Sequence, residues 1–234
     1  MTTQTDFAAL TPRELAPYIQ HTRIATGLTR DEMIAHAKET IEYGFNAAMV
    51  PGSWVSLTAK ELEGTGIGVA SALDFPTVGV TTPAGKAFEA ERLAEAGATQ
   101  IDMGVQVGYL KSGMFDEFRD DIAGVVRASG VPVKVMLELP LLSEAEKQAA
   151  VDLAMDAGVA FLKNASSGAI ETANRASIRY LVERARPGVQ VKASGAITNR
   201  AQAIELLSAG AVLLGTSAGI EIVTDSSDDQ TTSY

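Results

Sequence analysis

Short apolar runs alternate with amphipathic stretches along the whole chain. Eight runs have the length and composition of buried β-strands, at residues 17–22, 45–50, 67–73, 98–103, 131–139, 159–163, 189–192 and 211–215. Segments with helical spacing lie between several of them, at residues 29–44, 84–97, 143–158 and 198–210, and each ends in glycine, as helix termini often do. Strands that alternate with helices in this way predict a parallel sheet.

Eight strand–helix units in 234 residues predict an α/β fold of the (β/α)8 TIM-barrel type, which typically takes about 250 residues, rather than an open sheet. A composition that is 46% hydrophobic and 21% charged is sufficient for one large core. We therefore predict a single barrel over residues 1–224 with no second domain. Residues 225–234 are polar and acidic, and we predict a flexible tail there.

The charge balance excludes several classes of partner. A net charge of −10 argues against nucleic acid and against an anionic membrane surface, since both require a basic patch. The absence of cysteine excludes disulfides and thiolate catalysis, and two histidines leave little for a zinc site, with His36 predicted on an exposed helix face. The first residues lack a basic segment followed by an apolar run, and no apolar stretch reaches membrane-spanning length, so we expect a cytoplasmic protein.

Two lysines stand at the ends of neighbouring predicted strands. Lys163 closes the run 159–163 and Lys192 closes the run 189–192, with one helical segment between them. In an apolar wall, burial and the second ammonium would lower the pKa of Lys163, and a shift from about 10.4 to near 7 corresponds to roughly 4–5 kcal/mol. A neutral amine can attack a carbonyl and form a Schiff base. Alternatively, both lysines simply extend into solvent, but the small residues that follow each lysine leave room for a ligand.

Because reacting groups in such barrels lie at the carboxyl ends of the strands, Asp102 and Glu138 qualify as well. Lys134 lies inside its predicted strand and is expected to point into the barrel, where it can pair with Asp102. From the residues alone, Asp102 is as readily a structural carboxylate that caps a loop or pairs with Lys134 as a catalytic group.

Seven segments in order resemble the deoxyribose-phosphate aldolase family, class I aldolases on a (β/α)8 barrel. The resemblance covers nearly the whole chain, and the long middle segment is the most specific. The segments are YIQHTRIATGLT, YGFNAAMVPGSWV, DFPTVGVTTPAGKAFEAERLAEAGATQIDMGVQVGYLKSG, KVMLELPLLSEAEK, FLKNASSG, VKASGAIT and LLGTSAG. The resemblance implies reversible cleavage of 2-deoxy-D-ribose 5-phosphate to acetaldehyde and D-glyceraldehyde 3-phosphate, with small-molecule aldehydes and sugar phosphates as the partners, no cofactor or metal, and a homodimer.

The resemblance also implies roles for individual residues. Lys163 would form the Schiff base, Lys192 would perturb it and help protonation, and Asp102 would belong to a proton relay through water. Thr22 would donate hydrogen bonds to substrate hydroxyls, unless it is a core or capping threonine. The terminal Tyr234 would fold over the site and assist proton transfer, unless it is simply the last residue of a tail. Phosphate would be held by loops after the last strands, at Ser167, Gly168, Gly195, Gly215, Thr216 and Ser217.

Among the departures from the family pattern, three residues bear on proton transfer and phosphate binding. Gln20 stands where the family usually has aspartate, which removes a group that can take up a proton. Ala196 replaces a glycine and Ala218 replaces a serine in the expected phosphate loops, so we predict a weaker preference for phosphorylated substrates. Two alternatives therefore stay open, namely a Schiff-base barrel aldolase with a different donor or acceptor, and a non-catalytic barrel that binds sugar phosphates.

Overall fold

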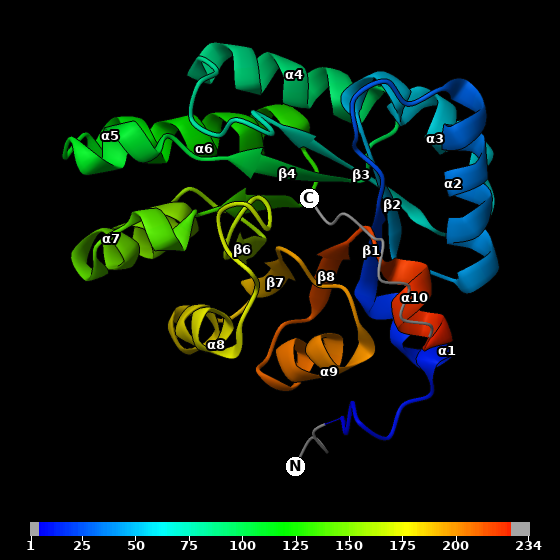
Figure 1. Cartoon of the computed structure of the whole chain (residues 1–234). Helices are drawn as coiled ribbons and strands as arrows, with labels where there is room; N and C mark the ends of the chain where they lie inside the picture. The colour runs from blue at the N-terminus through cyan, green and yellow to red at the C-terminus, as the bar shows by residue number, and fades with distance from the viewer. Residues whose placement is uncertain (1–4, 226–234) are drawn as a thin grey trace.

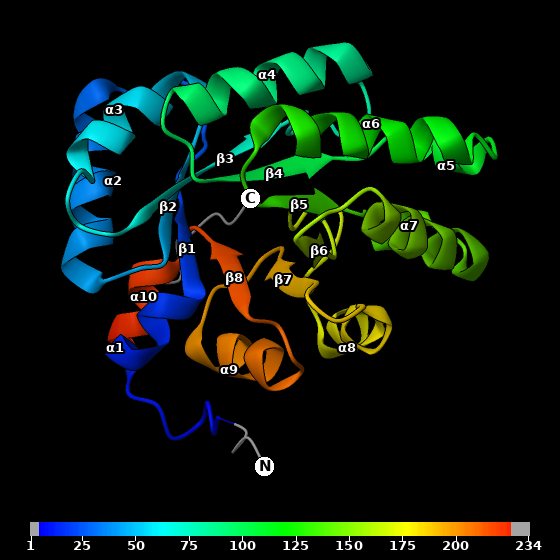
Figure 2. The same ribbon diagram turned by 180° about the vertical axis from the view of Figure 1, so that it is seen from behind.

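Eight parallel strands form a closed barrel in chain order. Figures 1 and 2 show the barrel in this computed structural model, which describes residues 5–225. Every predicted run overlaps one strand, although β4, β7 and β8 end one or two residues beyond the predicted ends, and β1 pairs with β8 to close the barrel. The TIM-barrel prediction is therefore confirmed. The strands are β1 (Ile19–Thr22), β2 (Ala47–Val50), β3 (Gly68–Leu73), β4 (Gln100–Gly104), β5 (Val133–Met136), β6 (Phe161–Lys163), β7 (Gln190–Ser194) and β8 (Leu213–Thr216).

Helices surround the barrel on its outside (Figures 1 and 2). They are α1 (Pro12–Leu15), α2 (Arg30–Tyr43), α3 (Val55–Glu61), α4 (Pro83–Glu95), α5 (Val107–Lys111), α6 (Phe115–Ser129), α7 (Glu144–Asp156), α8 (Arg175–Arg184), α9 (Arg200–Ser208) and α10 (Gly219–Thr224). Short 3₁₀ turns cover Ala16–Tyr18, Gly52–Trp54 and Leu139–Leu141. Within residues 5–225, no helix is long and apolar enough to cross a membrane.

Local sequence signals set the helix boundaries. Thr29 and Ser143 begin α2 and α7 with side chains that accept a backbone N–H one turn ahead, and a glutamate at that position bonds back to the cap. Gly44 ends α2 in the left-handed conformation, with φ of 72°. These caps fix where each helix stops and hence where the next strand enters the barrel.

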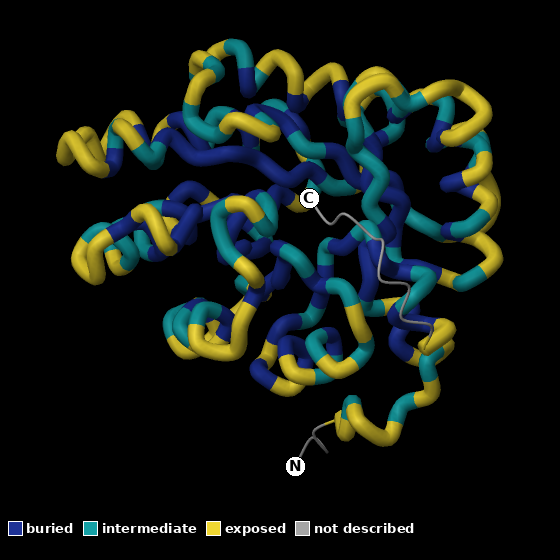
Figure 3. The backbone as a smooth tube through the Cα atoms, viewed as in Figure 1, coloured by how far each residue is buried: buried dark blue, intermediate teal, exposed yellow. Residues whose placement is uncertain are grey.

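The core lies between the strands and the inner faces of the helices, while the outer helix faces are exposed (Figure 3). His36 lies on the inner face of α2 together with Met33, Ala37 and Thr40, and its side chain is fully buried. The prediction of an exposed His36 is therefore wrong, because the residues three and four positions away that share its face pack against the barrel.

One barrel accounts for all of the described residues, and no second domain appears among them. Of the predicted tail 225–234, only Asp225 is described, so the tail and Tyr234 otherwise lie outside the described residues.

Candidate active site

Four charged side chains from four adjacent strands meet inside the barrel. Asp102 on β4 lies opposite Lys134 on β5, and Lys163 on β6 lies opposite Lys192 on β7, so the strand register brings both pairs to the same interior. The Asp102 Oδ2 atom accepts hydrogen bonds from Lys192 Nζ at 2.7 Å and from Lys163 Nζ at 3.0 Å. Lys134 Nζ lies 3.3 Å from Asp102 Oδ1, which confirms the predicted pairing of Lys134 with Asp102.

The side chains of the cluster lie at different depths in the barrel. Lys163 ends β6, as predicted. Lys192 and Asp102, however, lie in the middle of their strands, because β7 continues to Ser194 and β4 to Gly104. The prediction that these two residues close their strands is therefore wrong, since Ala193 and Ser194 continue β7 and Met103 and Gly104 continue β4. As a result both side chains are deeply buried, with exposed fractions of 1% for Lys192 and 0% for Asp102.

The electrostatics of the cluster follow from one buried carboxylate beside three amines. Burial opposes ionisation of Asp102, but the charges of Lys192, Lys163 and Lys134 outweigh it and hold the pKa of Asp102 below its usual range. Burial lowers the pKa of Lys192 well below 10.5 and also lowers the pKa of Lys134, while Asp102 opposes both shifts. One carboxylate cannot balance three buried ammonium groups, so the cluster favours a neutral amine.

Gln20 is a member of this cluster. It is fully buried on β1, and its Oε1 atom accepts a hydrogen bond from Lys192 Nζ at 2.5 Å. Its Nε2 atom donates to Asn46 Oδ1 at 3.2 Å and to Gln100 Oε1 at 2.7 Å, which fixes the orientation of the amide. The sequence marked Gln20 as a departure from the family, but it did not reveal the contact with Lys192, which joins residues far apart in the chain.

A pocket at the open end of the cluster is lined by both Lys163 and Lys192. It brings Lys163 and Lys192 together with Thr22 and with four of the six residues predicted to bind phosphate. Ser167 and Gly168 do not line it, and Ser166 lines it instead, which the sequence did not single out. The lining residues are Thr22, Ile24, Met49, Ala72, Phe75, Met136, Lys163, Ser166, Lys192, Ser194, Gly195, Gly215, Thr216 and Ser217.

The hydroxyl groups at the pocket differ in availability. Thr22 Oγ1 donates to the Gln20 carbonyl oxygen at 3.0 Å, so toward a ligand it offers its lone pairs. Thr216 Oγ1 donates to the Ile197 carbonyl oxygen at 2.5 Å. Ser217 Oγ is buried and has no hydrogen-bond partner among the described residues. Of these three, Ser217 is therefore the hydroxyl that is free to donate to an anion in the pocket.

The loop after β7 adopts a conformation that suits glycine. Gly195 has φ of 115°, and a Cβ atom there would overlap the carbonyl oxygen of Glu171. Ala196 has φ of 48°, so it adopts the left-handed conformation despite its Cβ atom. The alanine at this position thus places backbone strain in the loop that borders the pocket.

Glu138 supports the neighbouring loop. It lies just after β5 with φ of 52°, is 1% exposed, and accepts a hydrogen bond from the Ser166 N–H at 2.9 Å. Burial raises the pKa of Glu138. The sequence identified Glu138 only as a strand-end carboxylate, whereas the structure shows that it positions the backbone of a residue lining the pocket.

A buried amine that lines a pocket beside a carboxylate and a second amine can form a Schiff base with a carbonyl compound. Proton transfer to and from the substrate can then pass through the same groups. Among the described residues, the only cluster with metal-ligand character lies elsewhere, at His21, His36 and Glu39.

Comparison with known proteins agrees with this chemistry. A scan of family models finds no match. The chain is 40% identical over 210 residues to a deoxyribose-phosphate aldolase from Thermosynechococcus vestitus, covering 90% of this chain and 96% of the relative. It is 38% identical over 214 residues to a deoxyribose-phosphate aldolase from Methanothermobacter thermautotrophicus, covering 91% and 95%.

Solved structures show the same similarity. A putative deoxyribose-phosphate aldolase from Coccidioides immitis superposes with a TM-score of 0.84 at 27% identity, covering 96% of this chain and 91% of that one. A deoxyribose phosphate aldolase from Aeropyrum pernix, described as a tetramer, gives a TM-score of 0.83 at 27% identity and covers 92% of both chains. With sequence identity up to 40% over nine-tenths of its length and the same barrel, the chain belongs to the deoxyribose-phosphate aldolase family.

Proposed function

We propose that the protein is a class I aldolase that reversibly cleaves 2-deoxy-D-ribose 5-phosphate into acetaldehyde and D-glyceraldehyde 3-phosphate. The observation that carries the proposal is the contact of Lys163 Nζ with Asp102 Oδ2 at 3.0 Å on the wall of a pocket. The curated relatives carry the same activity in their names. A non-catalytic sugar-phosphate-binding barrel is not favoured, because such a protein has no need for this buried cluster.

Three features favour Lys163 as the nucleophile. It is the last residue of its strand and lines the pocket, whereas Lys192 lies in the middle of β7. Its exposed fraction is 6%, against 1% for Lys192 and 0% for Lys134. Its amine makes a single hydrogen bond among the described residues, whereas Lys192 is held by both Asp102 and Gln20. Lys163 therefore has the most freedom to reach a carbonyl carbon.

The reaction follows from this arrangement. The neutral amine of Lys163 adds to the aldehyde carbon of the open-chain sugar, and protonation of the resulting carbinolamine hydroxyl followed by loss of water gives an iminium ion. The iminium withdraws electrons from the bond between the second and third carbons, a base removes the proton of the third-carbon hydroxyl, and that bond breaks to release the phosphorylated aldehyde. The remaining enamine takes up a proton at the second carbon, and water releases acetaldehyde and the free lysine.

Lys192 and Asp102 are the groups placed to move protons. Burial lowers the pKa of Lys192 well below that of a free lysine, so its amine gives up its proton more readily and can accept and return one during the reaction. Asp102 stays ionised, bonds to both amines, and can pass protons between them or to a water molecule. Lys134, 3.3 Å from the other carboxylate oxygen, supports the ionised state of Asp102 from the side away from the pocket.

The phosphate group would bind at the loops after β7 and β8, where Gly195, Gly215, Thr216 and Ser217 line the pocket. The strained Ala196 and the methyl group of Ala218 weaken this site relative to a glycine and a serine. We therefore expect a smaller preference for 2-deoxyribose 5-phosphate over 2-deoxyribose than relatives have. A strong preference, measured as the ratio of kcat/KM values, would contradict this expectation.

Borohydride trapping tests the reaction itself. The protein is incubated with acetaldehyde and sodium borohydride, and the modified residue is found by peptide mass mapping. We expect ethylation at Lys163 and its loss in Lys163→Ala, while Lys111→Ala, which removes a lysine of α5 that does not line the pocket, should be labelled at Lys163 like the wild type. Labelling spread over many lysines without preference for Lys163 would refute the Schiff-base role.

Two further predictions concern assembly and the terminus. We propose a homodimer, whereas the A. pernix relative is described as a tetramer. Light scattering on the purified protein distinguishes the two, and a tetramer would refute the proposal. Deleting Tyr234 tests its predicted part in proton transfer, because an unchanged kcat would leave the terminal residue without that role.

A further inference from the structure

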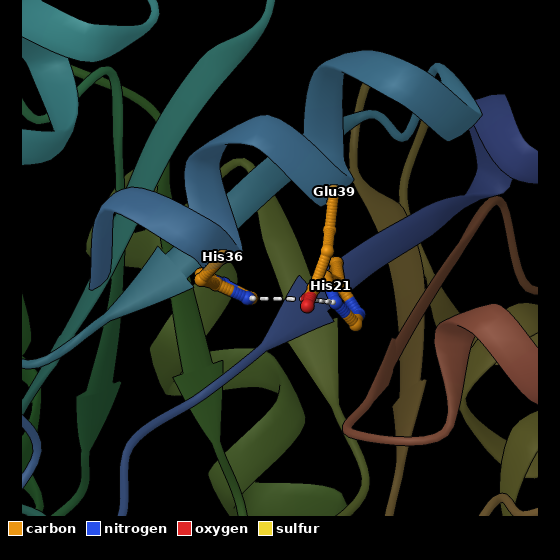
Figure 4. Close-up of side chains that lie close together, drawn as sticks. All are labelled: His21, His36 and Glu39. Atoms are coloured by element: carbon orange, nitrogen blue, oxygen red, sulfur yellow. Dashed lines mark hydrogen bonds and ion pairs between the residues drawn. The ribbon is translucent and has the colours of Figure 1, made fainter. Parts of the chain in front are cut away.

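Three potential metal ligands converge on the outer side of β1, away from the pocket. Gln20 and Thr22 face the barrel interior, so His21 between them faces outward toward α2. His36 and Glu39 lie one turn apart on the inner face of α2. Figure 4 shows the three side chains pointing toward one another, with the Glu39 carboxylate between the two imidazole rings.

The distances between the ligand atoms approach those of a metal centre. His21 Nε2 lies 3.2 Å and His36 Nδ1 lies 3.9 Å from the same oxygen, Glu39 Oε2. One ligand atom from each residue lies within 4.8 Å of the other two. Zinc–ligand bonds of about 2.0–2.1 Å at tetrahedral angles put ligand atoms about 3.3 Å apart. The His21–Glu39 distance already fits, and the His36–Glu39 distance needs to shorten by about half an ångström. The two imidazole nitrogens lie within 4.8 Å of each other and would also have to approach.

His36 provides the independent evidence for a ligand. Its side chain is fully buried, its Nε2 atom has no hydrogen-bond partner among the described residues, and its Nδ1 atom has only the contact with Glu39 Oε2 at 3.9 Å, which is too long for a hydrogen bond. Buried polar groups are nearly always satisfied, and an exception calls for an explanation such as an ion. The His21 ring stacks on Phe45 with centroids 4.7 Å apart and lies tilted against the His36 ring with centroids 4.5 Å apart, so packing restrains the His21 imidazole before any ion binds.

We propose that His21, His36 and Glu39 bind one divalent transition-metal ion, with Zn²⁺ the best match to two imidazoles and a carboxylate. Glu39 is 27% exposed, which gives an ion an entry path and leaves room for water as a fourth ligand. Arg23 lies on the same side, with its Nη2 atom 3.5 Å from Glu39 Oε2. Because Arg23 is 35% exposed, its guanidinium can move into solvent when the ion takes this oxygen.

The ion would cross-link β1 and α2 through its ligands. It would bind the folded chain only, because the ligands come from two elements that the fold brings together. It would therefore raise thermal stability with the logarithm of its concentration once that concentration exceeds Kd. The site lies on the opposite side of β1 from Lys192, so the proposal does not depend on the aldolase reaction.

Metal binding to the chelator-treated full chain tests the proposal. We expect titration calorimetry with ZnCl₂ to show one equivalent bound and Tm to rise with added Zn²⁺. We expect Co²⁺ in place of Zn²⁺ to give the intense visible absorption of a four-coordinate site. Absence of saturable binding, or only the weak absorption of six-coordinate Co²⁺, would overturn the proposal without any variant.

Three variants assign the site to these residues. His36→Gln and Glu39→Gln should each weaken Zn²⁺ binding at least about tenfold and abolish the rise in Tm, with basal activity unchanged. Arg23→Gln should strengthen binding, because it removes a cation that competes for the same oxygen. Affinities equal to wild type in both His36→Gln and Glu39→Gln would place the bound metal elsewhere and refute the proposal.

Discussion

Asp102→Asn tests whether one carboxylate neutralises the buried amines. The substitution keeps the shape of the side chain but removes the charge that Lys192, Lys163 and Lys134 approach to 2.7, 3.0 and 3.3 Å. Removing one partner of a buried ion pair typically costs about 3–5 kcal/mol. The cost arises because an amine that Asp102 kept protonated must now lose its proton on folding.

That cost depends on pH in a way that can be calculated. Deprotonating one lysine with an unfolded pKa of about 10.4 costs about 4–5 kcal/mol at pH 7 but only about 1 kcal/mol at pH 9.5, at 1.36 kcal/mol per unit. The unfolded variant binds more protons than the folded variant over this range, so its stability rises with pH. The difference in the free energy of unfolding between wild type and Asp102→Asn should therefore decrease by about 3 kcal/mol from pH 7 to pH 9.5.

Urea unfolding followed by circular dichroism at the two pH values measures this difference. Asp120→Asn is the control, because Asp120 is 67% exposed and pairs with Arg119 at the surface, so we expect little change in stability and little dependence on pH. A destabilisation of Asp102→Asn that stays constant between pH 7 and 9.5, or that is under about 1 kcal/mol at pH 7, would refute the idea that Asp102 keeps a buried amine protonated.

The loops and the remaining cluster residues yield three more predictions. Gly195→Ala should lose at least about 2 kcal/mol of stability in urea and most of its activity, because the added Cβ atom overlaps the backbone of Glu171. The control Gly108→Ala in α5 has open space at its Cβ position and should gain about 0.5–1 kcal/mol. Equal changes in stability for the two variants would contradict this prediction. Gln20→Glu places a second carboxylate at Lys192 and should raise the pKa of Lys192. The limb of the pH–rate profile that requires the neutral amine of Lys192 should then move to higher pH by about one to three pH units. An unchanged profile would rule out this role of residue 20. Burial raises the pKa of Glu138, so the unfolded state ionises first and the contribution of Glu138 to stability should fall as pH rises above about 4.3. Glu138→Gln should lack this contribution, so its stability relative to wild type should rise over this pH range and match or exceed wild type in urea at pH 7; a clear loss there would argue for a needed negative charge.

The fold was accessible from sequence because its signals are local. Each strand run and each capped helix can be identified within a window of some fifteen residues, and glycines such as Gly44 and Gly210 end helices where predicted. The lysine pair was accessible for the same reason, since Lys163 and Lys192 follow apolar runs.

Side-chain contacts across the barrel were not accessible in this way. The depth of Lys192 depends on how far β7 continues beyond it, and the apolar run alone does not set that end. The contact of Gln20 with Lys192 and the position of Ser166 rather than Ser167 at the pocket depend on strand register and loop geometry. His36 was misplaced because a polar residue on a helix is usually exposed, and its burial follows from the neighbours that share its face.

Gln20 changes the charge balance of the site as well as its proton transfer. With an acidic residue at this position, the cluster would contain two carboxylates for three amines, but the glutamine leaves Asp102 alone. Since each uncompensated ammonium is costly in the barrel interior, the amines in this chain give up protons more easily than they would beside a second carboxylate. The amide thus removes a proton acceptor from the relay and at the same time favours the neutral amines on which Schiff-base formation depends.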